Sequence, residues 1–223
     1  DDFVKILDSV NGNGIIAVNA SYARYGTSAN PIQTAAAYAA NFVRHMNQTL
    51  GANIKYWEVG NENYGPWQAG HVVNGDTING TKYGDIFNVF VDSMKSADPT
   101  IKIGAVLFPH DGVYNDWSKQ VLQKVENKAD FLIVHDYFRR KPNPNNVTYQ
   151  EMLNSINYAK SLESRDTEFA KNALPFMIEN FRDAVRSLTR QQYIDKPSKL
   201  ISNAAEDVKA AAVVCRFCGH EFA

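Results

Sequence analysis

The sequence predicts an α/β fold in which helices cover a parallel β-sheet. Short segments of strand length alternate along the chain with amphipathic segments of helical length. The strand-like segments are apolar throughout instead of alternating, which is typical of parallel strands buried on both faces. The 223 residues suffice for one sizeable core, and two ordinary domains are not the default at this length. We therefore expect residues 1–223 to form a single domain.

The expected strands are rich in β-branched and other apolar residues and are bounded by Gly or polar residues. In chain order they are residues 14–21, 54–59, 101–108, 131–137, 174–179 and 210–216.

The expected helices carry apolar residues at the spacing of one helical face. In the helix after the first strand, Asn30 is a good N-cap, Pro31 suits the first helical position and Gln33 stands where a capping box needs it. The chain also opens within a helix, at residues 3–10. The other expected helices are residues 83–94, 117–125, 149–162 and 187–208, the last one interrupted near Pro197.

This pattern gives about six β/α units, whereas a closed β/α barrel has eight. Two organisations follow from the alternation alone. Either the chain is a barrel that lacks its first two strands, or the sheet is open and doubly wound. The motifs described next decide between them.

The composition of the chain bears on which kinds of molecule it is expected to bind. The formal net charge is −1, so no electrostatic attraction to nucleic acid or to an anionic membrane is expected. The only cysteines are Cys215 and Cys218, which excludes a disulfide framework. No apolar run of transmembrane length is present. The compartment stays open from sequence, with an extracellular or periplasmic location favoured slightly over a cytoplasmic one.

A polar motif ends the second expected strand, in residues 56–65. Because the carboxyl ends of parallel strands form the ligand-binding edge of such sheets, Glu62 is expected at that edge. The two-residue period of a strand sends Glu58, Gly60 and Glu62 to the same side. Asn61 offers both a donor and an acceptor, which suits a sugar hydroxyl.

A second carboxylate, Glu179, ends the strand expected at residues 174–179. Hydrolysis of a glycoside with retention needs one carboxylic acid to protonate the leaving oxygen and one carboxylate to attack the anomeric carbon. Two glutamates that end two strands of one parallel sheet can converge to the separation of about 5 Å that this mechanism uses. A lone glutamate is otherwise most often a solvated loop residue.

Residues 56–65, taken with Trp67, resemble the acid/base signature of the clan A (β/α)8 glycoside hydrolases, and most closely that of the family 51 α-L-arabinofuranosidases. In those enzymes the nucleophile ends strand seven, and residues 177–180 stand in that place, without the residue that usually precedes Asn. The resemblance implies an incomplete (β/α)8 TIM barrel whose strands one and two are missing. The resemblance runs from about residue 1 to 180, and residues 181–223 are expected separately to hold the last helix and strand eight.

The resemblance also implies the roles of the site residues. Glu179 would be the nucleophile and Glu62 the acid/base, and no metal or cofactor would be needed. Asn61 would bind the 2-hydroxyl group of the sugar. The remaining residues expected to bind substrate are Asn19 at the edge of strand three, His135 and Tyr137 on one face of strand six, and Tyr64 and Trp67 beside the subsites.

The expected function is that of a retaining, α-L-arabinofuranosidase-like glycosidase acting on plant or algal oligo- or polysaccharide. The alternative is a catalytically inactive carbohydrate-binding barrel or fragment. Cys215, Cys218 and His220 resemble half of a zinc ribbon, but a structural zinc site needs four ligands. The expected reading is that both cysteines are small buried residues of the final strand. The oligomeric state is not determined by the sequence.

Overall fold

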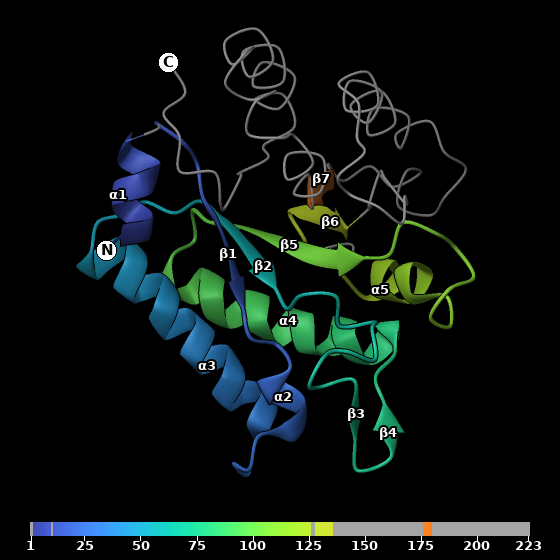
Figure 1. Cartoon of the computed structure of the whole chain (residues 1–223). Coiled ribbons are helices and arrows are strands. Elements are labelled where there is room, and N and C mark those ends of the chain that lie inside the picture. The colour runs from blue at the N-terminus through green and yellow to red at the C-terminus, as the bar shows by residue number, and fades with distance from the viewer. Residues whose placement is uncertain (1, 10, 126–127, 136–175, 180–223) are drawn as a thin grey trace, which may run out of the picture.

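A five-stranded parallel sheet organises the part of the chain that the structure describes (Figure 1). The computed structural model describes residues 2–9, 11–125 and 128–135, and residues 176–179 by their backbone. The expected helices at residues 149–162 and 187–208 and the strand at residues 210–216 lie outside the described residues.

The strands lie in the order β1-β2-β5-β6-β7, and every neighbouring pair is parallel. The first five expected strands are therefore confirmed in position and direction. Their bounds are β1 Ile15–Val18, β2 Tyr56–Val59, β5 Lys102–Leu107, β6 Phe131–His135 and β7 Phe176–Glu179.

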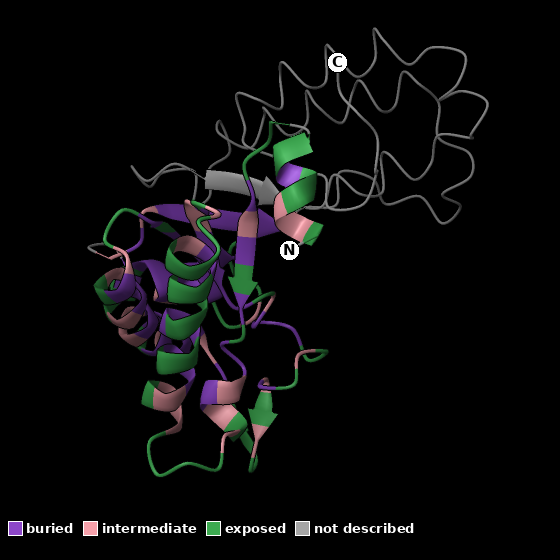
Figure 2. Cartoon of the chain, turned by 90° about the vertical axis from the view of Figure 1, so that its left-hand side faces the viewer, coloured by how far each residue is buried: buried purple, intermediate pink, exposed green. Residues whose placement is uncertain are grey.

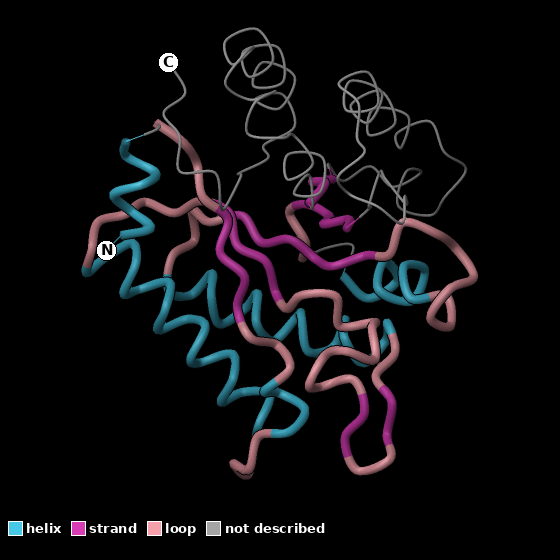
Figure 3. Tube along the Cα trace, in the orientation of Figure 1, coloured by secondary structure: helices cyan, strands magenta, loops and turns pink. Residues whose placement is uncertain are grey.

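Three helices pack side by side along one face of the sheet, with α4 between α3 and α5 (Figures 1 and 3). The short helix α1 lies at the amino end of β1, and α2 follows the carboxyl end of that strand. None of the described helices is long and apolar enough to cross a membrane. The helices are α1 Asp2–Ser9, α2 Tyr22–Tyr25, α3 Pro31–Arg44 with the π-helical turn η1 His45–Thr49, α4 Gly80–Ala97 and α5 Trp117–Val125.

Helix α3 begins at Pro31 as expected, but the expected capping box is wrong. The side chain of Asn30 makes no capping hydrogen bond, because at ψ 74° its backbone departs from the extended conformation that aims an N-cap side chain at the first turn. The carbonyl of Asn30 instead accepts from the backbone N–H and the hydroxyl of Thr34. By contrast, the Asn79 side chain caps α4 by accepting from the N–H of Lys82.

The two faces of the sheet carry different side chains. Trp57 and Val59 of β2 are buried toward the helices, and Figure 2 shows this interior in purple beneath the green outer face of α3. On the opposite face Tyr56 meets Phe131 edge-on, with ring centroids 6.0 Å apart. Since side chains alternate along a strand, Glu58 shares the face of Tyr56, and His135 shares the face of Phe131.

A small hairpin stands beyond the carboxyl end of β2 (Figure 1). Strands β3 (Val72–Val73) and β4 (Asp76–Thr77) are joined by Asn74 and Gly75, both at positive φ, as a two-residue hairpin turn requires. Arg24 of α2 donates to the side chain and the carbonyl of Asp76, and Lys82 of α4 forms an ion pair with the same carboxylate. The hairpin is thus anchored to two helices.

Tyr83 provides a test of how α4 is attached to the sheet. Its fully buried hydroxyl donates to the carbonyl of Val59 at 2.7 Å and accepts from the N–H of Val106 at 2.9 Å. We predict that Tyr83→Phe lowers the free energy of unfolding by about 1–3 kcal/mol, because buried backbone groups lose a hydrogen-bond partner. Urea denaturation measures this, with Tyr38→Phe on the exposed face of α3 as control. Equal stability of both variants would contradict this attachment.

Candidate active site

The turn after β2 fixes where the motif residues point. Gly60 adopts φ +91°, and a Cβ atom built on it would lie 1.9 Å from Oδ1 of Asn63, so only glycine fits. That Oδ1 accepts from the N–H of Asn61, and Nδ2 of Asn63 donates to the hydroxyl of Ser21. Asn63, which sequence reasoning quoted within the motif but gave no role, therefore ties the turn to the end of β1.

Glu62 sits at the carboxyl edge of the sheet in a strained backbone conformation. Its φ of +45° lies in the left-handed region, which costs a non-glycine residue on the order of 1 kcal/mol or more. The N–H of Gly65 donates to the carbonyl of Glu62 at 2.8 Å and closes the turn. Such strain persists only where surrounding contacts impose it, and it is concentrated at functional sites.

Both carboxyl oxygens of Glu62 are held by side chains, one from the same loop and one from the end of β6. The indole N–H of Trp67 donates to Oε2 at 2.8 Å, and Nδ1 of His135 lies 3.0 Å from Oε1. The side chain of Glu62 is 13% exposed, whereas Trp67 is 59% exposed. The carboxylate is therefore oriented from two sides and still accessible to solvent, beside an exposed aromatic ring.

These contacts lower the pKa of Glu62 below its ordinary value. The largest cause is the hydrogen bond with His135, and burial acts in the opposite direction. The charge of His135 and hydrogen bonds from Trp67 and Tyr64 lower the pKa further. The described surroundings thus favour the ionised carboxylate, so a role as acid needs a further negative charge close by.

Glu58 lies behind His135, away from solvent. It is 2% exposed, and its Oε1 is 3.8 Å from Nε2 of His135. The imidazole of His135, 4% exposed, is therefore flanked by a carboxylate near each ring nitrogen. Sequence reasoning placed Glu58 on the side of Glu62 but assigned it no function. A glutamate inside an otherwise apolar strand was the available signal.

Tyr64 belongs to an aromatic cluster that supports the Trp67 ring. Its ring is buried and stacks on Tyr114 with centroids 5.1 Å apart, while Phe108 and Trp67 meet it edge-on at 4.9 and 6.3 Å. Trp117 of α5 closes the cluster at 5.8 Å. Tyr64 thus lies behind Trp67, and Trp67 presents the exposed aromatic surface.

Two expected asparagines lie on neighbouring turns at the same edge. Oδ1 of Asn19 accepts from the N–H of Tyr22, the first residue of α2, and its Nδ2 lies 3.5 Å from the hydroxyl of Tyr25. Asn61 is exposed directly after Gly60. The side-chain amide of Asn19 is therefore engaged within its own segment, and Asn61 is solvent-accessible.

Glu179 ends β7 at the same edge of the sheet as Glu62. Its Cα is the parallel register partner of His135, the residue whose imidazole contacts Glu62. The structure describes Glu179 by its backbone, so the separation of the two carboxyl groups stays a prediction. Tyr137, Cys215, Cys218 and His220 lie outside the described residues. Within the described part of the chain, no group of three or more His, Cys, Asp or Glu side chains is placed to hold a metal ion.

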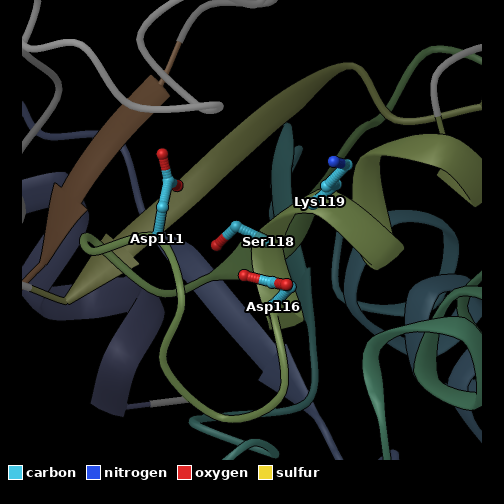
Figure 4. Close-up of a pocket in the computed structure, with 4 residues that line it drawn as sticks. All are labelled: Asp111, Asp116, Ser118 and Lys119. Atoms are coloured by element: carbon cyan, nitrogen blue, oxygen red, sulfur yellow. The ribbon is translucent and has the colours of Figure 1, made fainter.

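A separate polar pocket lies where the β5–α5 loop meets α5 (Figure 4). It is lined by Asp111, Asp116, Ser118 and Lys119. Asp116 accepts from the N–H of Gly112, and the Ser118 hydroxyl both donates to and accepts from the backbone of Phe108. Two of the lining residues therefore already serve to shape the loop.

Comparison with known proteins identifies related enzymes, although no family profile matches the chain. It is 27% identical over 149 residues to an intracellular exo-α-(1→5)-L-arabinofuranosidase of Acetivibrio thermocellus, covering 64% of this chain and 28% of that protein. It is 32% identical over 92 residues to intracellular exo-α-(1→5)-L-arabinofuranosidase 1 of Bacillus subtilis, covering 40% of this chain and 17% of that protein. The chain thus spans less than a third of the length of these relatives.

The names of these relatives overturn one expectation from the sequence. Four matched arabinofuranosidases, from Acetivibrio thermocellus, Bacillus subtilis, Bifidobacterium longum and Halalkalibacterium halodurans, are named as intracellular enzymes. The preference for an extracellular or periplasmic location is therefore wrong. That preference had no physical basis in the chain, because overall composition does not specify a cellular compartment.

The fold gives a second, independent comparison. A crystal structure of an α-L-arabinofuranosidase from Thermotoga maritima in complex with arabinose matches with a TM-score of 0.50 and 23% identity, covering 79% of this chain and 36% of that chain. This likeness concerns the fold alone. The sequence relatives, together with this likeness in fold, relate the chain to α-L-arabinofuranosidases, the enzymes that its motif around Glu62 resembles.

Proposed function

We propose that the protein containing this chain is a retaining α-L-arabinofuranosidase-like glycosidase, with Glu62 as acid/base and Glu179 as nucleophile. The observation that carries the proposal is the carboxylate of Glu62, held at the edge of the sheet by His135 and Trp67 on a strained backbone. The relatives in sequence are arabinofuranosidases, and a plant or algal arabinose-containing oligo- or polysaccharide is the proposed substrate.

We also propose that the five strands are consecutive strands of a (β/α)8 barrel that forms a single catalytic domain. All five are parallel and in chain order, as in such a barrel. On the face away from α3, α4 and α5, Tyr56, Phe131 and Ile133 form an apolar layer. A barrel interior is filled by such layers, and the polar layer of Glu58 and His135 lies toward the carboxyl ends of their strands.

The reaction would proceed by double displacement. The carboxylate of Glu179 attacks the anomeric carbon while Glu62 gives its proton to the leaving oxygen, so that a glycosyl ester forms and the aglycone departs. Glu62, now ionised, takes a proton from water. The resulting hydroxide equivalent attacks the anomeric carbon and releases both the sugar and Glu179. The exposed ring of Trp67 and the amide of Asn61 are the proposed contacts to the sugar.

The pKa of Glu62 supports a change of role between the two steps. Before the first step, an ionised Glu179 nearby would oppose the effect of His135 and favour the protonated acid. Once Glu179 is esterified its charge is gone. The contacts that lower the pKa of Glu62, with His135 first among them, then act alone and favour the ionised base that the second step needs.

Glu62→Ala tests the assigned role of this residue. We predict a rate loss of about 100-fold or more on aryl α-L-arabinofuranosides with poor leaving groups, and a much smaller loss in the first step for activated ones, because an activated phenolate departs without protonation. Azide should restore turnover of activated substrates by attacking the glycosyl-enzyme from the vacated side. Equal losses for both substrate types, without azide rescue, would rule out Glu62 as acid/base.

His135→Gln tests the electrostatic part of the account through the pH profile. Because the contact with His135 lowers the pKa of Glu62, removing the imidazole should raise that pKa. The first step needs protonated Glu62, so the alkaline limb of kcat/KM should move to higher pH. His45→Gln, at the end of α3 and remote from the motif, serves as the control and should keep the wild-type profile. An alkaline limb that stays in place or moves to lower pH in His135→Gln contradicts the assignment.

A further inference from the structure

Glu58 is a buried carboxylate that the proposed reaction does not use. It belongs to β2, where its neighbours Trp57 and Val59 are fully buried toward the helices, and it projects to the opposite face. At 2% exposure, it does not reach the solvent-accessible region where Glu62 and Trp67 would meet a sugar. Burial raises the pKa of the Tyr83 hydroxyl, and the nearby carboxylate of Glu58 contributes a smaller increase.

Burying a carboxylate is costly unless a polar or cationic group compensates it. His135 lies close enough to contribute such compensation, since its Nε2 is 3.8 Å from Oε1 of Glu58. This distance is too long for a direct hydrogen bond but short enough for an electrostatic contact between a carboxylate and a ring N–H edge. The imidazole that contacts Glu62 therefore also lies within electrostatic range of Glu58.

The neighbouring backbone leaves room for this contact across the sheet. The register partner of Glu58 on β5 is Gly104, which has no side chain to separate β2 from β6 on this face. A Cβ atom at Gly104 would lie 2.5 Å from the Phe131 ring, so the aromatic layer fills the space below. The side chains of Glu58 and His135 meet directly above that layer.

We propose that Glu58 is a positioning residue that acts through His135: its carboxylate holds the imidazole by the Nε2 edge, so that Nδ1 stays directed at Oε1 of Glu62. The proposal rests on the proposed function of Glu62 and extends it by a third carboxylate that never touches substrate. The described carboxylates near His135 include Glu58 of β2 and Glu62 of the loop after β2, and Glu179 of β7 is the backbone register partner of His135.

Kinetics of the protein containing this chain test the proposal. Glu58→Gln keeps the shape and removes the charge, and it should lower kcat by about 10- to 100-fold through misplacement of Glu62, with KM within about twofold. Glu58→Asp keeps the charge and should retain more activity than Glu58→Gln. Asp92→Asn, an exposed carboxylate on α4 paired with Lys128, is the matched control and should behave as wild type.

A double-mutant cycle separates positioning from general damage. If Glu58 acts through His135, Glu58→Gln should cause little further loss of kcat in a His135→Gln background, because the two residues form one unit. If the losses of kcat from the two single substitutions multiply in the double variant, the proposal is overturned. It is also overturned if Glu58→Gln keeps the same kcat as the control Asp92→Asn.

NMR of the ¹⁵N-labelled imidazoles gives a readout that does not depend on activity. Both Glu58→Gln and Glu62→Gln should change the ring nitrogen shifts of His135 and leave those of His45 in place. Unchanged His135 shifts in Glu58→Gln would refute the contact. A wild-type protein without glycosidase activity but with the predicted shifts would refute the proposed function and leave the Glu58–His135 contact supported.

Discussion

The contact between Glu62 and His135 joins the loop after β2 to the end of β6, across the intervening strand β5. Its distance of 3.0 Å relates two residues 73 positions apart, and it is the largest influence on the pKa of Glu62. The contact depends on the parallel direction of β2, β5 and β6, because parallel strands bring their carboxyl ends to one edge of the sheet. The contact between Glu62 and His135 therefore depends on the sheet topology and on side-chain alternation, and it influences the protonation of the candidate site.

Local geometry determines whether that pair can form. Gly60 turns the chain at φ +91°, and Asn63 fills the space that a side chain at Gly60 would occupy. Glu62 then adopts a left-handed backbone conformation, and its carboxylate lies between His135 and Trp67. The energy stored in this turn is offset by the surrounding core, where Tyr83 ties α4 to β2 and β5. The packed sheet thus stabilises the strained turn at residues 60–62.

The sequence predicted the strands well because each is a compact apolar run, and it predicted α5 at residues 117–125 from a regular apolar stripe. Helix α4 extends beyond the predicted residues 83–94 because its ends are small and polar, and the Asn79 cap was overlooked. The hairpin was missed since Val72 and Asp76 are not part of an apolar alternation, although Asn74-Gly75 is a strong turn signal.

The sequence could predict those residues of the candidate site that lie at the ends of strands. Motif and strand spacing located Glu62, but no local pattern reports that His135 approaches both Glu62 and Glu58. Such contacts arise from strand register over long sequence separations. The same limit explains why Tyr64, expected beside a subsite, was not recognised as part of the cluster behind Trp67.

The most direct measurement of the central claim is to trap the glycosyl-enzyme in the Glu62→Ala variant. With an activated aryl α-L-arabinofuranoside, the first step should proceed while the second stalls for want of a base, so the covalent ester should accumulate. Proteolysis and mass spectrometry should then find one pentosyl group on the peptide that contains Glu179, and none when Glu179→Gln is added. A pentosyl group on another residue, or an activated phenol released without any covalent adduct, would contradict the pairing of Glu62 with Glu179.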